Sequence, residues 1–402
     1  MNGCVFKREL KSGKLTWGYV IDAGKGEDGK RKQIFKSGFK RKIDADVALA
    51  KLVTERVDGT LVKPDPRTFA EFSEAWLAEY ADTSCSPKTA ERYREMMAHV
   101  TREIGQQPLG KVTTLQLQRV YNQLLKDGKT VRVPGGKERR PMSVKTVRNI
   151  HGAVHVAFET AVDWGLLRVN PASRCKLPPV PRREAVALDF SAARHLLEVS
   201  SDHWLSDFLV VSTASGCRRG ELLALSWRDV APDYRSITIG TSLEQTKAGL
   251  RLKPTKGNNI RTIPLPEDAA AVLKQIRMNR EENRKLYGAD YRNDLDLVFC
   301  HPDGNYILPG TVTKSVRRIA KKAGFSRVSL HNLRHSHGSQ LLSAGVPLPV
   351  VSKRLGHTDP YTTARVFSHA LASDEAAAAE KWATAMKESE AKVVEMPVRK
   401  QA

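Results

Sequence analysis

The first sixty residues change from a strand-like to a helix-like pattern of apolar positions. Two short strands are expected between residues 4 and about 37, at 14–22 and 31–39, with a turn rich in Gly and Asp between them. From Lys42 the spacing becomes three to four residues, which predicts a helix. Its apolar positions are Ile43, Val47, Ala50 and Val53 or Val57. The pattern therefore predicts a hairpin that is covered by one helix.

A second pattern begins after the proline-containing segment 62–68, which cannot continue a helix and is typical of a linker. Four stretches between residues 69 and 167 have apolar residues at helical spacing, and Ser86, Thr113 and Ser143 are plausible N-caps. They predict a compact all-helical domain that starts near Thr68. Residues 129–141, rich in Gly, Pro and charge, are expected to form an exposed basic loop, which either contacts phosphates or is simply mobile.

Residues 170–184 contain four prolines and four basic residues and predict a second linker. From about Ala185 onward, helical patterns alternate with two strands, at 235–240 and 261–266, so the last domain is expected to be helix-rich with a small antiparallel sheet. Residues 372–389 predict an amphipathic helix with Asp374 and Glu375 near its start and Trp382 and Met386 on one side. This helix would pack either on its own domain or on another subunit.

These patterns predict a multidomain α+β protein, whose 402 residues exceed one ordinary core. The expected divisions are a small sheet-plus-helix domain, an all-α domain, a linker, a mixed and mainly α domain, and a tail, at residues 1–63, 64–174, 175–184, 185–390 and 391–402.

The charge of the chain indicates the class of its partner. Lys and Arg number 66 against 44 Asp and Glu, which gives a net charge of +22 spread along the sequence. Residues 1–63 alone hold 15 basic and 8 acidic residues, a net +7. Nucleic acid is the polyanion that best fits this balance, and a ribosome-associated or merely basic protein is the alternative.

The cysteines and the apolar runs indicate the compartment. Five scattered cysteines without a C-x-x-C pair argue for a reducing cytoplasm and against a disulfide framework or a zinc ribbon. Apolar runs stay shorter than a membrane span, and the first ten residues lack the apolar core of a signal peptide. We therefore expect a cytoplasmic protein without a membrane partner.

Three separated motifs carry candidate chemistry. In 215–227, Gly216 permits a tight entry to a helix and places Arg218 near its start, where an arginine can face a phosphate. In 254–265, Lys256 occupies a turn between two strands. In 329–345, a helix opened by Ser329 or His331 carries His331 and Arg334 on one face. Taken singly, each residue is more often an ordinary surface group.

A zinc site formed by His331 and His335 is the metal alternative, since two histidines one helical turn apart are a familiar ligand pair. The motif offers neither a carboxylate nor a further cysteine, and two arginines would repel the ion. We therefore expect no metal and no other cofactor.

Together these motifs resemble those of the tyrosine recombinase, or phage integrase, family. Arg218, Lys256, His331, Arg334 and His357 match the family's catalytic set in order and spacing, and Phe367 stands ten residues after His357, where the family has its nucleophilic tyrosine. The resemblance implies that residues 1–63 bind arm-type DNA sites, that 64–174 form a SAM-like core-binding domain, and that 185–390 form the catalytic domain.

The implied reaction breaks and rejoins DNA through a 3′-phosphotyrosine. The arginines would hold the non-bridging oxygens, the histidines would add hydrogen bonds, and Lys256 would protonate the leaving 5′ oxygen. Phe367 has no hydroxyl, so we expect this chain to bind DNA without cleaving it. Tyr361, the only nearby phenol, follows His357 by four residues, six short of the expected place. The intact remainder favours a deliberate Tyr-to-Phe change over decay of an old element.

The resemblance also implies partners. It suggests a homotetramer on two double-stranded DNA sites in a bacterial cytoplasm, associated with the nucleoid, with a host DNA-bending protein and an excisionase as further partners to consider. A DNA-binding protein without enzymatic purpose is the main alternative, and the retained Lys256 counts against it. A type IB topoisomerase shares the chemistry but has no need of the first domain. The candidate DNA-contacting residues are Lys30, Arg31, Lys32, Lys40, Arg41, Lys88, Arg92, Arg139, Arg140, Lys145, Arg182 and Arg183.

Overall fold

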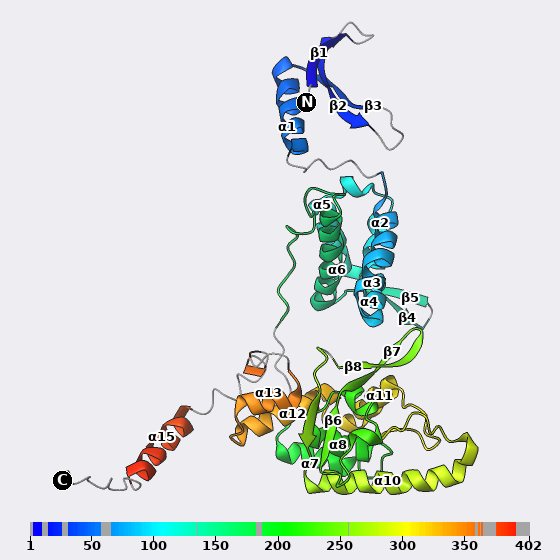
Figure 1. Cartoon of the computed structure of the whole chain (residues 1–402), viewed down its shortest axis with the longest axis vertical. Helices are drawn as coiled ribbons and strands as arrows, with labels where there is room; N and C mark the ends of the chain where they lie inside the picture. The colour runs from blue at the N-terminus through cyan, green and yellow to red at the C-terminus, as the bar shows by residue number, and fades with distance from the viewer. Residues whose placement is uncertain are drawn as a thin grey trace, which may run out of the picture. The chain divides into compact units, whose positions relative to one another are not determined.

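The computed structural model of the chain (Figure 1) describes most of its residues. They are 3–9, 15–25, 31–57, 66–134, 136–181, 187–255, 257–357, 361, 363–364 and 375–390. Two compact units are present, Met1–Pro181 and Arg182–Ala402. Two expected site residues, Lys256 and Phe367, lie outside the described residues.

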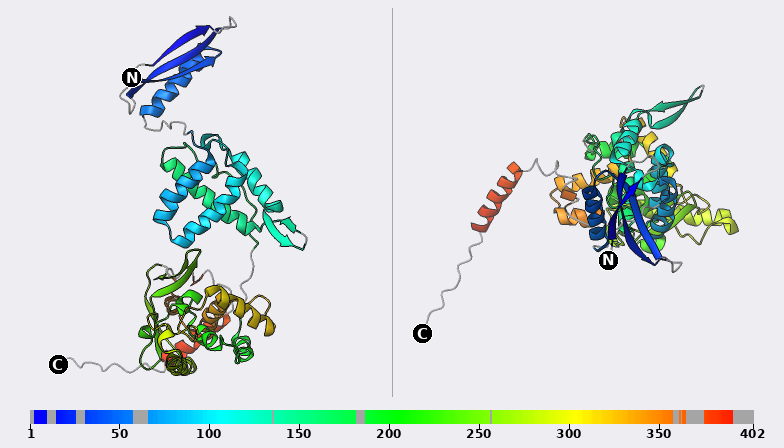
Figure 2. Two further views of the ribbon diagram at one scale, coloured as in Figure 1. Left: turned by 90° about the vertical axis from the view of Figure 1, so that its right-hand side faces the viewer. Right: turned by 90° about the horizontal axis from the view of Figure 1, so that it is seen from above.

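The N-terminal part is a three-stranded antiparallel sheet with one helix against one face (Figure 2). The strands β1, β2 and β3 are Gly3–Glu9, Leu15–Lys25 and Arg31–Phe39, and the helix α1 is Lys42–Val57. The pattern predicted β2, β3 and α1, but it missed β1.

The apolar face predicted for α1 was wrong at three of its positions, whereas Val53 is half-buried. Ile43 and Val47 are 61% and 64% exposed, and Ala50 is also exposed. Ala45 is fully buried instead. A Cβ added to Gly3 would lie only 2.7 Å from Cδ1 of Leu49, so the helix packs closely on β1 at this point. A helix lies closely on a sheet through its small side chains, so Ala45 and the side-chain-free Gly3 fix the rotation of α1.

Four helical regions form the second part of this unit. The elements are α2 (Phe69–Trp76), η1 (Leu77–Ala81), α3 (Asp82–Ser84), α4 (Pro87–Ile104), η2 (Leu109–Lys111), α5 (Thr114–Asp127) and α6 (Val144–Asp163). All three predicted N-caps are confirmed, because the hydroxyls of Ser86, Thr113 and Ser143 each accept a hydrogen bond from the backbone N–H three residues later. The core includes the fully buried aromatic side chains of Phe69, Phe72, Trp76, Tyr121 and Phe158.

The pattern predicted a purely helical domain, but the structure also contains a short sheet. Residues 129–141 contain a β-hairpin, with β4 at Lys129–Val133 paired antiparallel to β5 at Gly136–Arg140. The prediction of an exposed loop was wrong about the backbone but right about exposure, since every residue of β5 is exposed. Both strands are short and mostly polar, and the two half-buried valines of β4, Val131 and Val133, are too few to predict a strand.

The second unit surrounds two small antiparallel sheets with helices. Strand β6 (Ser236–Ile239) pairs with β9 (Arg261–Pro264), as predicted, and β7 (Thr241–Thr246) pairs with β8 (Gly249–Pro254) in a hairpin that the pattern missed. The core joins apolar side chains of the β6/β9 sheet to those of the surrounding helices, Ile237 and Ile263 among them.

The remaining elements of this unit are α7 (Phe190–Val199), α8 (Ser206–Ser215), α9 (Arg219–Leu223), η3 (Trp227–Asp229), α10 (Glu267–Tyr287), η4 (Gly288–Asp290), α11 (Pro309–Lys322), α12 (Leu330–Ser343), α13 (Leu348–Leu355) and α15 (Glu375–Glu390). The predicted C-terminal helix is thus present, and Trp382 and Met386 on it are 68% and 46% exposed. Among the described residues, no helix has the length and apolarity needed to cross a membrane.

Candidate active site

The site begins where α8 ends. Gly216 closes α8 in the left-handed conformation, with φ of +65°, and a Cβ there would lie 2.5 Å from Cδ2 of His337. Only glycine meets both demands without strain. The chain then turns immediately into α9 with Arg218 at its N-cap, so the tight entry predicted for Gly216 is what places Arg218.

A buried carboxylate fixes the Arg218 side chain. Glu221, 2% exposed, accepts hydrogen bonds from the backbone N–H of Arg218 and from its Nη1, both at 2.8 Å. It also accepts from Nη2 of Arg261 at 2.6 Å. Burial raises the pKa of Glu221, but the hydrogen bond and charge of Arg261 outweigh burial and leave the pKa below its usual range. Glu221 is therefore ionised at neutral pH.

Arg334 is held mainly by backbone carbonyls. Its side chain is buried, and its Nη1 donates to the carbonyl of Gly216 at 2.8 Å while its Nη2 donates to that of Leu355. The adjacent Gly356 carbonyl accepts from Nη2 of Arg218 at 3.2 Å. Burial, and then repulsion from Arg218, lower the pKa of Arg334 to about 9, which still leaves it charged at neutral pH. Two guanidinium groups thus meet where α8 and α13 end.

Partial burial, and then repulsion from these arginines, lower the pKa of two histidines of the site. His331 is exposed as a residue, but its ring is partly shielded, and this shielding together with Arg334 and Arg218 lowers its pKa. Partial burial and then the same two arginines lower the pKa of His357 to about 4. Nδ1 of His357 lies 2.7 Å from Oγ1 of Thr363.

His331 has a close neighbour one helical turn along α12. Its Nε2 lies 2.9 Å from Nε2 of His335, and the two rings meet edge-on with their centroids 4.4 Å apart. Such a contact needs one proton between the two nitrogens, so one ring donates and the other accepts. Among the described residues, no group of three or more His, Cys, Asp or Glu side chains is placed to hold a metal ion.

The sequence did not indicate three residues of this centre, namely Arg261, His337 and Arg354. Arg261, 6% exposed, links Glu221 to the carbonyl of Arg354 at 3.0 Å. Arg354 donates from Nε to Nε2 of His337 at 3.0 Å, and from Nη2 to the carbonyls of Ala214 and Pro264. It thereby joins α8, β9, α12 and α13. The only sequence signal was that each of the three lies inside or beside a recognised motif.

The structure therefore brings together four of the six expected site positions, namely Arg218, His331, Arg334 and His357. Lys256 and Phe367 lie outside the described residues. The flanks of Lys256 form a tight turn, in which Gly257 and Asn258 both have positive φ and Oγ1 of Thr255 donates to the carbonyl of Asn259 at 2.7 Å. Tyr361, the alternative phenol, is 69% exposed.

Most described side chains among the expected DNA contacts lie on the surface. Lys40, Arg92 and Lys145 are exposed. Several of the others form weak surface ion pairs, which a phosphate can replace. These pairs are Arg41 with Asp44, Lys88 with Glu91, Arg139 with Asp127 and Arg140 with Glu138. Lys30, Arg182 and Arg183 lie outside the described residues, and for Arg31 and Lys32 only the backbone is described.

Three family models match the chain in order. The arm DNA-binding domain matches residues 5–55, the phage integrase N-terminal SAM-like domain matches 68–125, and the phage integrase family matches 187–373. A tyrosine recombinase XerC-like protein of Caldanaerobacter subterraneus is 26% identical over 384 residues, which are 90% of this chain and 94% of the relative. An integrase of Streptomyces ambofaciens is also 26% identical and covers 90% and 93%.

Solved structures share the fold at lower sequence identity. The Tn1549 transposon integrase, in complex with a circular intermediate DNA, superposes with a TM-score of 0.62 at 18% identity, over 75% of this chain and 95% of that one. A lambda integrase dimer bound to a core site gives 0.54 at 15% identity, over 90% and 94%. With three family models matched in order and relatives similar along nearly their whole length, the chain belongs to the phage integrase family of tyrosine recombinases.

Proposed function

We propose that this chain is a site-specific DNA recombinase of a phage or another integrative element, in which Phe367 permits DNA binding and prevents cleavage. The observation that carries the proposal is the pair of fixed guanidinium groups, Arg218 and Arg334, beside the neutral His331 and His357. This arrangement suits a phosphodiester, because Arg218 offers a fixed cationic donor and Arg334 adds positive charge beside it.

The charge of the centre supports a phosphate ligand. Arg218, Arg261 and Arg334 meet one buried carboxylate, Glu221, and Arg334 donates to carbonyls instead of to a carboxylate. The three guanidinium groups and one carboxylate leave a net charge of about +2 in a partly desolvated site, where uncompensated charge is costly. A phosphodiester anion supplies the missing negative charge, and it would also raise the pKa of His331 and His357.

The roles of individual residues follow from their positions. Arg218, whose side chain is 39% exposed, can reach a bound phosphate directly, whereas the buried Arg334 contributes mainly positive charge and holds the ends of α8 and α13 together. For Lys256 we propose, from the family resemblance, the proton transfer to the leaving 5′ oxygen. A tyrosine at position 367 would form the bond to phosphorus as the bond to O5′ breaks, and phenylalanine cannot.

We further propose that residues 1–63 bind arm-type sites and that residues 64–174 and 185–390 bind core-type sites. The Tn1549 and lambda integrases were solved on DNA, the latter also as a tetramer on a Holliday junction. A tetramer on two duplexes is the matching assembly for this chain. The exposed Trp382 and Met386 on α15 are the apolar side chains we assign to contacts between its subunits.

Duplex binding at increasing salt tests the DNA-binding part of the proposal. We expect fluorescence anisotropy of a labelled duplex to show affinity falling by orders of magnitude between about 50 and about 200 mM salt. Arg218→Gln should lower the slope of log affinity against log salt by roughly one unit, and Arg235→Gln, at an exposed arginine paired with Glu267, serves as its control. An affinity that does not change with salt would contradict the proposal.

A further inference from the structure

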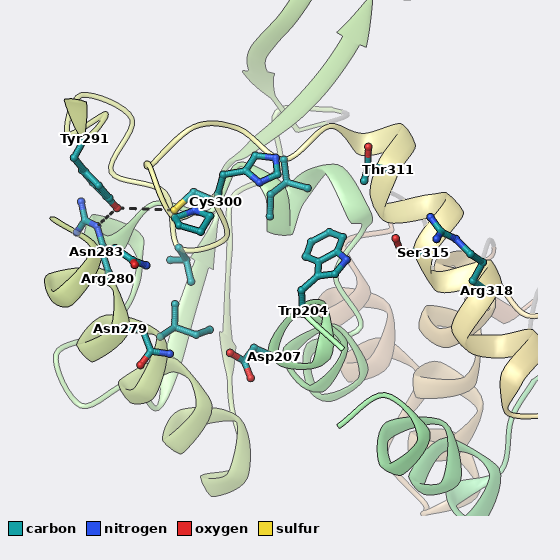
Figure 3. Close-up of a pocket in the computed structure, with 15 residues that line it drawn as sticks. Trp204, Asp207, Asn279, Arg280, Asn283, Tyr291, Cys300, Thr311, Ser315 and Arg318 are labelled. Atoms are coloured by element: carbon teal, nitrogen blue, oxygen red, sulfur yellow. Dashed lines mark hydrogen bonds between the residues drawn. The ribbon is translucent and has the colours of Figure 1, made fainter. Parts of the chain in front are cut away.

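A second concave site lies in the catalytic unit, apart from the arginine centre. It is a pocket of about 600 Å³ lined by residues of α8, α10 and α11, by Trp204 just before α8, and by the segment between α10 and α11 (Figure 3). None of the residues assigned above to the arginine centre lines it. The volume is in the range of pockets that hold small organic ligands.

One wall combines an aromatic ring with a carboxylate that lacks a counter-ion. Trp204 is 53% exposed at the pocket, and Asp207 on the first turn of α8 is partly buried. The carboxylate of Asp207 forms no hydrogen bond or ion pair to another described residue, and burial raises its pKa. A partly desolvated carboxylate without a partner is a costly arrangement, which a hydrogen-bond donor from a ligand would relieve.

The opposite wall offers a free cation. Arg318 on α11 is exposed and pairs with no other described residue, and Thr311 and Ser315 lie on the same face of that helix (Figure 3). Arg280, by contrast, is engaged by Asp296 at 2.8 Å and by the hydroxyl of Tyr291 at 3.3 Å, so it belongs to the framework of the pocket. In Figure 3, Trp204 stands between Asp207 on one side and Ser315 and Arg318 on the other.

These groups require a ligand of mixed chemistry. A simple cation would satisfy Asp207 and be repelled by Arg318, while a simple anion would do the reverse. A ligand that satisfies both needs a flat ring for Trp204, a donor edge for Asp207 and an anionic group for Arg318. Guanine carries two adjacent donors, N1–H and the N2 amine, on the edge away from its sugar phosphate, whereas adenine presents no such pair.

We propose that this pocket binds a guanine nucleotide. The base stacks on Trp204 and donates to the carboxylate of Asp207, and Arg318 binds the phosphate. The nucleotide is either free in solution or an extrahelical guanosine within a DNA strand. The proposal does not depend on the DNA-cleavage function.

Calorimetric titration of the full chain tests this inference, with guanosine monophosphate, adenosine monophosphate and inorganic phosphate as probes. We expect the guanine nucleotide to bind about tenfold or more tightly than the adenine nucleotide, because a bidentate contact discriminates by roughly that factor. Asp207→Asn should abolish this preference. Arg318→Gln should weaken the binding of guanosine monophosphate but not the binding of guanosine. The affinity for both should fall on acidification as Asp207 becomes protonated.

Neighbouring residues supply matched controls. Asp202 and Arg317 are exposed and do not line the pocket, so Asp202→Asn and Arg317→Gln should leave binding unchanged. Single-stranded oligonucleotides with one guanine or none distinguish the two sources of the nucleotide, and duplex binding by Asp207→Asn shows that the variant is folded. The proposal is overturned if the two nucleotides bind equally, or if the guanine preference survives Asp207→Asn. It is also overturned if no nucleotide binds the parent chain while Trp204→Leu loses self-association, because the pocket would then be a contact between subunits.

Discussion

Glu221→Gln isolates the carboxylate that joins Arg218 to Arg261. The substitution keeps the volume of the side chain and one acceptor oxygen, but it replaces the second oxygen with an amide that faces guanidinium donors. At least one of the close contacts, at 2.8 Å to Nη1 of Arg218 or at 2.6 Å to Nη2 of Arg261, must therefore be lost. Arg261, at 6% exposure, would be left as a buried cation without its counter-ion.

The expected cost is about 3 to 5 kcal/mol of unfolding free energy, the range for removing one partner of a buried ion pair. Loss of one or two hydrogen bonds to charged groups, at about 1.5 to 3 kcal/mol each, gives a similar figure. Because the pKa of Glu221 is lowered in the fold, its contribution is complete above the ordinary carboxyl pKa and is lost as pH falls through the folded value. A measurement at neutral pH therefore records the whole effect.

Hydrogen exchange read by mass spectrometry provides the local measurement. Peptides from α9 and β9 should show the loss of opening free energy, while peptides from α4 to α6, in the other compact unit, serve as an internal reference. Glu267→Gln is the matched control, since Glu267 is 88% exposed and lies 3.6 Å from Arg235. If Glu221→Gln lowers the opening free energy no more than the control does, Glu221 does not stabilise Arg218 and Arg261 as described.

Three further predictions concern other parts of the structure. Gly216→Ala and Gly165→Ala both place a side chain at positive φ, which costs about 1 to 2 kcal/mol of unfolding free energy. Of the two glycines, only Gly216 has a close neighbour, His337, so the melting temperature should fall further for Gly216→Ala. Equal shifts of the melting temperature would contradict the packing described. Burial and Arg354 lower the pKa of His337 to about 4, so the fold keeps this side chain neutral. The unfolding free energy should therefore drop by about 3 kcal/mol as the pH falls from about 6.5 towards 4. If urea titrations of the chain and of His337→Gln show the same pH dependence, His337 is not the cause. In a Phe367→Tyr background, Tyr361→Phe should leave the yield of covalent DNA adduct on a denaturing gel unchanged, and a loss of adduct would make Tyr361 the nucleophile.

The sequence predicted the elements whose apolar pattern or capping residues are local signals. Ser86, Thr113 and Ser143 mark helix starts because a hydroxyl there satisfies a backbone N–H within the same turn. The strands that were missed, β1, β7 and β8, and the hairpin at 129–141, are rich in charged or polar residues and partly exposed. They are held by pairing with a neighbouring strand, and the apolar alternation within them, such as Val131 and Val133 in β4, covers too few residues to predict that pairing.

The site was predicted to the extent that its chemistry is written in motif spacing. Four of its residues could be named because their motifs resemble the family's catalytic set in order and spacing, namely Arg218, His331, Arg334 and His357. The supporting residues Arg261, His337 and Arg354 could not, because their roles lie in contacts between segments far apart in the chain. The bond from Arg354 to the carbonyl of Ala214, for example, spans 140 positions.

The proposed function requires a recombinase site that is complete apart from one hydroxyl. Its most direct test compares this chain with Phe367→Tyr on a nicked suicide duplex, carrying a core site recovered by selection for binding, and looks for a covalent protein–DNA adduct on a denaturing gel. We expect both proteins to bind the duplex and only Phe367→Tyr to form the adduct. An adduct with the present chain, or none with either protein while both bind, would contradict the proposed function.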